Sequence, residues 1–197
     1  MSSREKILAA VKKAQPDLLA LPHREYLSVK TGDVQQFQTI VEALGAKAYT
    51  LKEEEEVIPY LEKLFPEAKR VVSAVTSIER YWINEHKNIP YHSLQDVDIA
   101  IIKAQFGVAE NGALWVTEED LKIRVLPFIC EHLVAIVDAH AIVANMHEAY
   151  DRIGSADYGF GVFIAGPSKT ADIEQSLVLG AHGPKSMTVF VRHPELP

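Results

Sequence analysis

The sequence predicts one α/β domain, a three-layer sandwich around a mostly parallel sheet, preceded by an N-terminal helical arm. Apolar runs of strand length alternate with helix-like runs at both ends of the chain. Several of these apolar runs lack polar alternation, which is typical of strands covered on both faces. The chain has 197 residues, of which 48% are hydrophobic, so it is long enough to bury a core. We place the arm at residues 1–30 and a single domain at residues 31–197.

The first part of the chain alternates helices with strands. An amphipathic helix is predicted over residues 3–14, because charged residues surround apolar residues at helical spacing. A second helix over residues 34–45 has one apolar stripe and ends at a glycine. A strand, a helix that begins with acidic residues and a buried strand follow at residues 46–51, 52–65 and 70–75.

The middle of the chain predicts an antiparallel insertion. Residues 97–117 are rich in strand formers, and Asn111–Gly112 is the strongest hairpin signal in the sequence. The other predicted elements are a helix with a loop at residues 77–94, a helix at 139–154, and strands at 122–129, 132–138, 158–166 and 186–191.

Composition narrows the classes of partner. The net charge of −7 does not favour sequence-independent binding to nucleic acid, and no stretch approaches the roughly 20 apolar residues that span a bilayer. Because Cys130 is the only cysteine, the chain can form no internal disulfide and cannot hold an iron–sulfur cluster by itself. With no signal-peptide pattern at the N-terminus, we expect a soluble, cytoplasmic protein that binds small molecules or proteins. The glutamate run at residues 53–56 fits either a solvated helix face or an acidic docking face.

The segment "GPSKTADIEQSLVLGAHGP", residues 166–184, predicts a binding loop. A strand, a glycine turn and then a helix over residues 172–181 would bring free amides to the end of a buried strand, where α/β proteins bind anions. Gly166 allows close approach of the backbone, Ser168 or Thr170 can cap the helix, and Lys169 adds a positive charge. The spacing is not that of a P-loop.

Glu174 and His182 are the candidate catalytic residues of this segment. On a helical wheel Glu174 falls inside the apolar arc, which fits either a structural ion pair or a carboxylate that faces a ligand. His182 fits either a hydrogen bond to the last helix carbonyls or an exposed ring that titrates near neutral pH.

Other residues offer weaker signals. Glu110 and Gly112 lie at the predicted hairpin turn, where they serve either the turn or a ligand. The eight histidines lack metal-ligand spacing, so we predict no metal site. Neither a dinucleotide-binding G-x-G-x-x-G nor a hydrolase G-x-S-x-G is present, and Cys130 fits a small core residue.

The segment at residues 166–184 resembles the lactate utilisation protein C family, whose shared module is the LUD domain. The resemblance extends over "DIAIIKAQFGVAENGALWV", "LPFICEHLVAIVDAHAIV" and "SMTVFV", roughly residues 70–192. It implies a fold similar to the sugar-phosphate isomerase and CoA-transferase-like α/β group. It also implies a non-redox role in oxidising L-lactate to pyruvate, with two iron–sulfur partner proteins that carry the clusters. The alternative is an autonomous small-molecule enzyme of this fold group that binds an anionic substrate.

Overall fold

A five-stranded parallel sheet forms the centre of the protein. The computed structural model describes residues 2–17, 19–20, 32–78, 90–173 and 176–194. The strands follow the order β1-β11-β6-β3-β2, and each neighbouring pair is parallel. Their bounds are β1 Lys47–Leu51, β2 Val71–Ser73, β3 Ile99–Lys103, β6 His132–Asp138 and β11 Ser186–Arg192. The predicted α/β class with a mostly parallel sheet is confirmed.

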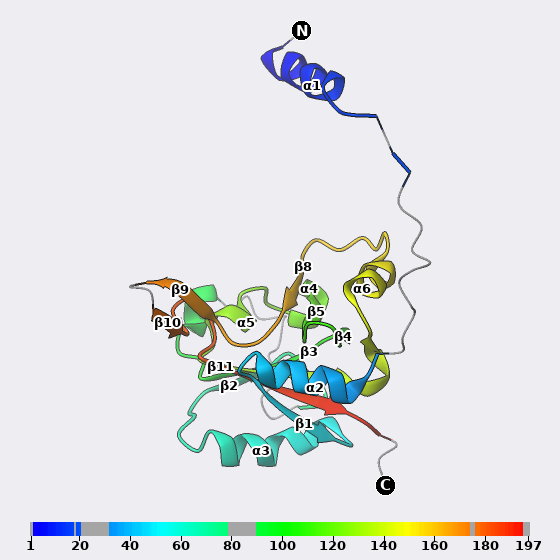
Figure 1. Ribbon diagram of the computed structural model, residues 1–197. Coiled ribbons are helices and arrows are strands. Elements are labelled where there is room, and N and C mark those ends of the chain that lie inside the picture. The colour runs from blue at the N-terminus through cyan, green and yellow to red at the C-terminus, as the bar shows by residue number, and fades with distance from the viewer. Residues whose placement is uncertain (1, 18, 21–31, 79–89, 174–175, 195–197) are drawn as a thin grey trace.

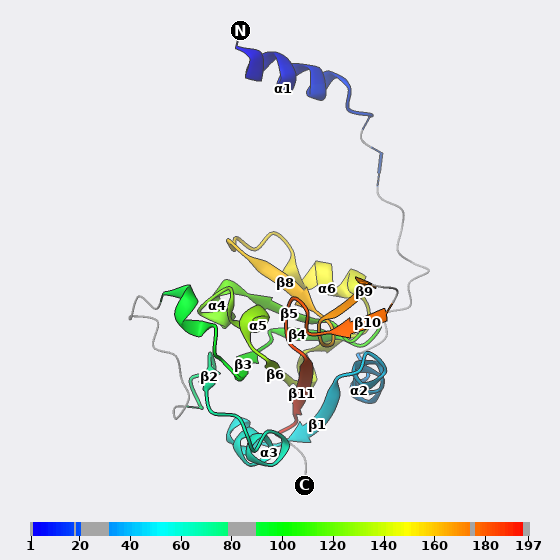
Figure 2. The ribbon, with the colours of Figure 1, turned by 90° about the vertical axis from the view of Figure 1, so that its left-hand side faces the viewer.

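Both faces of this sheet are covered, which explains why its strands are apolar at nearly every position. Helix α3 (Val57–Leu64) packs on one face, against alternate residues such as Ile101, Ile136 and Phe190. Helix α2 (Val34–Ala43) and the short helix α5 (Leu126–Ile129) pack on the other face. In Figures 1 and 2, α3 lies below the parallel sheet and a second sheet lies above it.

The predicted insertion contributes its antiparallel hairpin to a second sheet, which is mainly antiparallel. It follows the order β7-β4-β5-β8, with bounds β7 Ile142–Val143, β4 Phe106–Val108, β5 Leu114–Thr117 and β8 Gly161–Ile164. The predicted hairpin at Asn111–Gly112 is confirmed: β4 pairs antiparallel with β5, and Gly112 has a φ of 68°. Helix α6 (Met146–Ile153) packs on this sheet, and helix α4 (Glu118–Leu121) follows β5.

Helix α1 (Ser3–Lys13) stands apart from the rest of the chain (Figures 1 and 2). A capping box closes its start, where the Ser2 side chain accepts from the Glu5 amide and the Glu5 carboxylate accepts from the Ser2 amide. None of its residues is buried, and Ile7, Leu8 and Val11 are 63%, 53% and 54% exposed. Local capping and helix propensity therefore account for α1, since none of its side chains is buried against the described part of the chain.

The strand predicted over residues 122–129 is wrong. Lys122 ends α4 with a φ of 61°, and α5 forms instead of the strand. Pro127 lies in the first turn of α5, where a missing N–H costs nothing, whereas a strand would lose a ladder hydrogen bond there.

The helix predicted over residues 139–154 is correct only in its second half. A 3₁₀ turn, η4 (Ala139–Ala141), and strand β7 replace the first half, and the Ala109 amide donates to the Val143 carbonyl at 2.8 Å. Pairing with the second sheet therefore outweighs local helix propensity. Helix α6 begins after Asn145, whose side chain accepts from the Glu148 amide at 3.0 Å. The predicted stop at Gly154, which has a φ of 56°, is confirmed.

The remaining boundaries follow the sequence closely. The acidic helix predicted at residues 52–65 forms as a 3₁₀ turn, η1 (Glu54–Glu56), which continues into α3. Another 3₁₀ turn, η3 (Tyr91–Leu94), ends the region predicted as a helix with a loop, of which residues 79–89 lie outside the described part.

Candidate functional site

The segment at residues 166–184 folds as a hairpin, so the predicted helix over residues 172–181 is wrong. Strands β9 (Lys169–Ile173) and β10 (Ser176–Leu179) pair antiparallel, with Thr170 opposite Val178. β-branched residues such as these two favour extended backbone, and cross-strand pairing satisfies the amides that a helix would otherwise have used. At the base of the hairpin the Gly180 amide donates to the Ser168 carbonyl at 3.1 Å.

This correction removes the physical argument for an anion site at a helix start. Ser168 and Thr170 have no helix to cap, and the Ser168 amide donates to the Pro184 carbonyl at 2.9 Å. Glu174 lies outside the described residues, and the helical wheel that turned it toward a covered face no longer applies. Its catalytic role stays a prediction.

Three of the predicted ligand-binding residues gather at the end of α2. A Cβ added to Gly166, whose φ is 73°, would lie 3.2 Å from Leu44 Cβ, and one added to Gly112 would lie 3.1 Å from Leu44 Cδ1. Lys169 Nζ would lie 3.9 Å from a Cβ built on Gly45. The two glycines thus allow the turns to pack closely on α2, and Lys169 places its charge near the negative end of the helix dipole.

Glu110 has a structural contact in the fold. Its carboxylate accepts from the Met146 amide at 3.0 Å, at the first turn of α6, and its own amide donates to the Ala144 carbonyl at 3.0 Å. A carboxylate at a helix start stabilises the free amides there. A ligand contact for Glu110 stays a prediction.

His182 is exposed and lines a hollow of about 470 Å³ where the parallel strands begin. We call this edge of the sheet the amino edge. Its walls are the end of α5, which contributes apolar Phe128 and Ile129, and the loops before β3, β6 and β11, which contribute Asp96 and Glu131 among others. These acids are already paired, Asp96 with Arg70 and Glu131 with Lys185.

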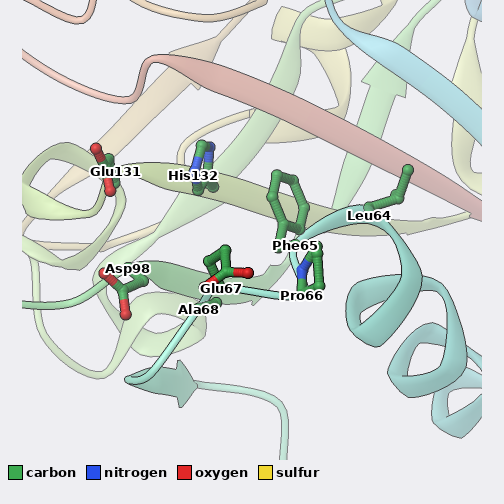
Figure 3. A pocket seen from close by; sticks show the side chains of 8 residues that line it. All are labelled: Leu64, Phe65, Pro66, Glu67, Ala68, Asp98, Glu131 and His132. Carbon is green, nitrogen blue, oxygen red and sulfur yellow. The ribbon is translucent and has the colours of Figure 1, made fainter.

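A second hollow of about 260 Å³ adjoins the first and shares Asp98 and Glu131 with it. Figure 3 shows His132 beside Phe65, and the two rings stack at 4.4 Å between centroids. His132 Nδ1 lies 2.8 Å from Ser186 Oγ, its partner across the strands. Burial lowers the pKa of His132, so its ring is neutral at pH 7.

Asp98 has a backbone role at the same edge. Its carboxylate accepts from the Arg70 and Lys69 amides at 2.8 and 2.6 Å, and these bonds hold the pKa of Asp98 below its ordinary value. The polar groups of the amino edge therefore mainly secure the loops that enter the sheet.

Charged residues gather at the opposite edge, where the parallel strands end. Lys103 Nζ lies 2.5 Å from Glu54 Oε1 and 3.5 Å from Asp138 Oδ2, and Arg192 Nε lies 2.5 Å from Asp138 Oδ1. Ser77 Oγ donates to Glu54 Oε2. We call Glu54, Lys103, Asp138 and Arg192 the carboxyl-edge cluster.

Strand register brings this cluster together. Asp138 lies directly opposite Arg192, and Lys103 lies opposite Ile136, two residues before Asp138. Because residues two apart share a face, all three strand residues continue the apolar face that packs on α3. Glu54 reaches them from η1, the turn that leads into α3.

The two carboxylates of the cluster are held in their charged form. Burial alone would raise the pKa of Glu54, but hydrogen bonds from Lys103 and Ser77 outweigh it and keep that pKa below its ordinary value. Burial likewise opposes the charge of Asp138, and the hydrogen bond from Arg192 with the charge of Lys103 lowers its pKa. Asp138 therefore stays a carboxylate that orients Arg192.

The carboxyl-edge cluster is the candidate site because open α/β sheets bind ligands outside the carboxyl ends of their strands. None of its four residues is among the site residues predicted from the sequence. The available signal was a single charge at the end of each of three apolar runs, "IAIIK", "VAIVD" and "VFVR". The glutamates at residues 53–56 also differ in burial: Glu54 is 8% exposed, whereas the other three are exposed.

The described residues were compared with the requirements of a metal site and of a reactive thiol. Across them, no group of three or more His, Cys, Asp or Glu side chains is placed to hold a metal ion. Cys130 is 2% exposed, and burial raises its pKa to about 12, so it is a core residue and not a nucleophile. None of the helices in those ranges is long and apolar enough to cross a bilayer.

Comparison with known proteins gives a consistent family. A family model for the LUD domain matches residues 77–191. The chain is 26% identical over 169 residues to a lactate utilization protein C from Shouchella clausii (strain KSM-K16), and the match covers 82% of this chain and 70% of the relative. It is 32% identical over 111 residues to a lactate utilization protein C from Geobacillus sp. (strain WCH70), covering 53% of this chain and 45% of that protein.

A solved structure has the same fold. The crystal structure of a DUF162 family protein from Deinococcus radiodurans matches with a TM-score of 0.60 and 16% identity, over 81% of this chain and 96% of the other. At this identity the likeness concerns the fold alone. It agrees with the α/β sandwich described above.

Proposed function

The chain belongs to the LUD domain family, and from this premise we propose that it is a component of an L-lactate utilisation system. The proposal rests on one observation: the family match extends over residues 77–191, and relatives matched over that region are named lactate utilization protein C. That region includes two of the four residues of the carboxyl-edge cluster, Lys103 and Asp138, and it ends one residue before Arg192.

In this proposal the chain carries no electrons itself. Its only thiol, Cys130, is buried with a pKa of about 12, whereas iron–sulfur clusters are held by several thiolates. We therefore propose that two iron–sulfur partner proteins carry the clusters that oxidise lactate to pyruvate, and that this chain assists by binding or by completing the assembly.

Reconstitution tests the proposal. The two iron–sulfur partners are purified, and lactate-dependent reduction of a dye is measured with and without this chain. We expect the rate to rise with added chain until the three proteins are equimolar, and the chain to co-elute with the partners in gel filtration. D-lactate serves as the control substrate.

Two results would count against the proposal. The first is a dye-reduction rate that is the same with and without the chain, together with separate elution of the three proteins. The second is dye reduction by the chain alone, which would place the redox chemistry in this protein.

A further inference from the structure

Within the described part of the chain, the carboxyl-edge cluster has hydrogen-bond donors without an acceptor, whereas its acceptors are occupied. Both oxygens of Glu54 are engaged, one by Lys103 and one by Ser77, and both oxygens of Asp138 face cations. Arg192 donates from Nε to Asp138, and within the described residues its terminal nitrogens have no acceptor. The side chain is 25% exposed, so solvent or a ligand can reach it.

Asp138 fixes the direction of the terminal nitrogens of Arg192. It lies directly opposite Arg192 on the neighbouring strand and binds only Nε, so the guanidinium plane is anchored at its inner end. The outer end then presents parallel N–H groups, the geometry that matches the two oxygens of an oxyanion. Lys103, with 37% of its side chain exposed, lies beside the same carboxylate and adds a second donor.

We infer that the carboxyl-edge cluster is a binding site for a small carboxylate, held by the terminal nitrogens of Arg192 with Lys103 beside it. The cluster contains two cations and two carboxylates, so its net charge is near zero. Recognition therefore depends on directed hydrogen bonds, and a neutral analogue that lacks the oxyanion does not bind.

The oxyanion class follows from the geometry alone. The choice of a carboxylate over a phosphate rests on the function proposed above, since lactate and pyruvate are both carboxylates. A planar fork suits either group, so the experiment must separate the two.

Titration calorimetry on the full chain, without partner proteins, tests this site. The probes are L-lactate, pyruvate, inorganic phosphate and L-lactamide, the neutral amide of lactate. The variants are Arg192→Lys, which keeps the charge but loses the fork, and Lys185→Met as a control that removes a cation from the amino edge. We expect Arg192→Lys to weaken carboxylate binding about tenfold or more, the effect of one charged hydrogen bond, and Lys185→Met to leave it unchanged.

The outcomes separate the alternatives. If phosphate binds more tightly than the carboxylates and its binding depends on Arg192, the oxyanion site stands but the assignment of a carboxylate as its ligand is overturned. No binding of either anion, equal binding of lactamide, or equal binding by Arg192→Lys overturns the site. If Arg192→Lys does not fold, NMR of the wild-type Arg192 side chain during lactate titration decides, because a bound carboxylate must shift its N–H signals. Success here with failed reconstitution would leave the site standing without the proposed system.

Discussion

Asp138 shows how one carboxylate can organise a sheet edge. It bonds Arg192 across the strands and lies 3.5 Å from Lys103, with 17% of its side chain exposed. Ion pairs at this depth contribute little net stability when intact, but losing one partner leaves charges unpaired. The arrangement is therefore better explained by the need to hold Arg192 and Lys103 in place than by stability.

Replacing Asp138 with Asn should lower the free energy of unfolding by about 1–3 kcal/mol at pH 7, since Arg192 loses its charged partner and Lys103 keeps only Glu54. The folded-state pKa of Asp138 is depressed, so its contribution is complete above the unfolded pKa of about 4 and is lost as pH falls through the lower folded pKa. Urea denaturation across pH should show the gap between wild type and variant closing below about pH 4.

The exposed pair offers a control for this experiment. Asp96 pairs with Arg70 at the amino edge, and its side chain is 67% exposed. Asp96→Asn should change the unfolding free energy by less than about 1 kcal/mol, as is usual for surface ion pairs. Equal effects of the two substitutions would mean that burial of the carboxyl-edge cluster has no energetic consequence.

Cys130 should be unreactive in the folded protein. With a pKa of about 12, its thiolate is a very small fraction at pH 8, and burial also blocks access. A thiol-specific chromogenic reagent should therefore react slowly in buffer and promptly in denaturant. Fast reaction of the native protein would contradict the packing described for this residue.

At the scale of elements, tight turns decide how the second sheet meets α2. Gly112 and Gly154 both have positive φ, but only Gly112 lies against side chains, with Leu44, Ile40 and Val41 within 3.3 Å of an added Cβ. Gly154→Ala should cost about 1 kcal/mol from backbone strain, and Gly112→Ala clearly more because α2 must also move. Thermal or urea unfolding of both variants measures the difference; equal costs would exclude a packing role for Gly112.

No residue of helix α1 is buried, so removing residues 1–16 should change the unfolding free energy of the remaining chain by less than about 0.5 kcal/mol. The comparison is Leu61→Ala in α3, where a side chain that is 4% exposed is lost and the expected cost is about 2–5 kcal/mol. A large loss of stability on removing α1 would reveal packing that the structure does not contain.

Elements differ in how well the sequence predicts them. The strands of the parallel sheet and the Asn111–Gly112 hairpin carry their signals locally, as apolar runs and turn chemistry, and both are confirmed. The helix predicted at residues 172–181 failed because its apolar spacing also fits a hairpin, and only the cross-strand pairing, such as Thr170 with Val178, separates the two. The same holds for Ile142 and Val143, which join the second sheet.

The candidate site was missed for a reason of topology. Lys103, Asp138 and Arg192 each end a different strand, and nothing in a local window indicates that these strands are neighbours. Their order, β11-β6-β3, becomes visible only when the whole sheet is known. Glu54 is hidden further, because it is one of four adjacent glutamates and only it turns inward.

On the scale of the whole molecule, β11 connects the first strand to the rest. It lies between β1 and β6, and it is the only described neighbour of β1 in the sheet. A chain that ends at residue 185 lacks β11, so β1 has no strand to pair with and α2, which packs on β1, loses its support. We therefore expect this shortened chain to lose cooperative unfolding. Near-UV circular dichroism and urea titration test this, and a cooperative transition with an unchanged slope would contradict it.

The position of β11 near the end of the chain also delays the pairing of β1 during biosynthesis. The ribosome releases β1 early and β11 late, and at roughly 5–20 residues per second the interval is on the order of ten seconds. Throughout that interval the nascent β1 offers an open, hydrogen-bonding edge, the kind that recruits chaperones or sticks to other chains. Codon usage or chaperone supply should therefore affect the yield of this protein more than that of folds whose neighbouring strands are translated in succession.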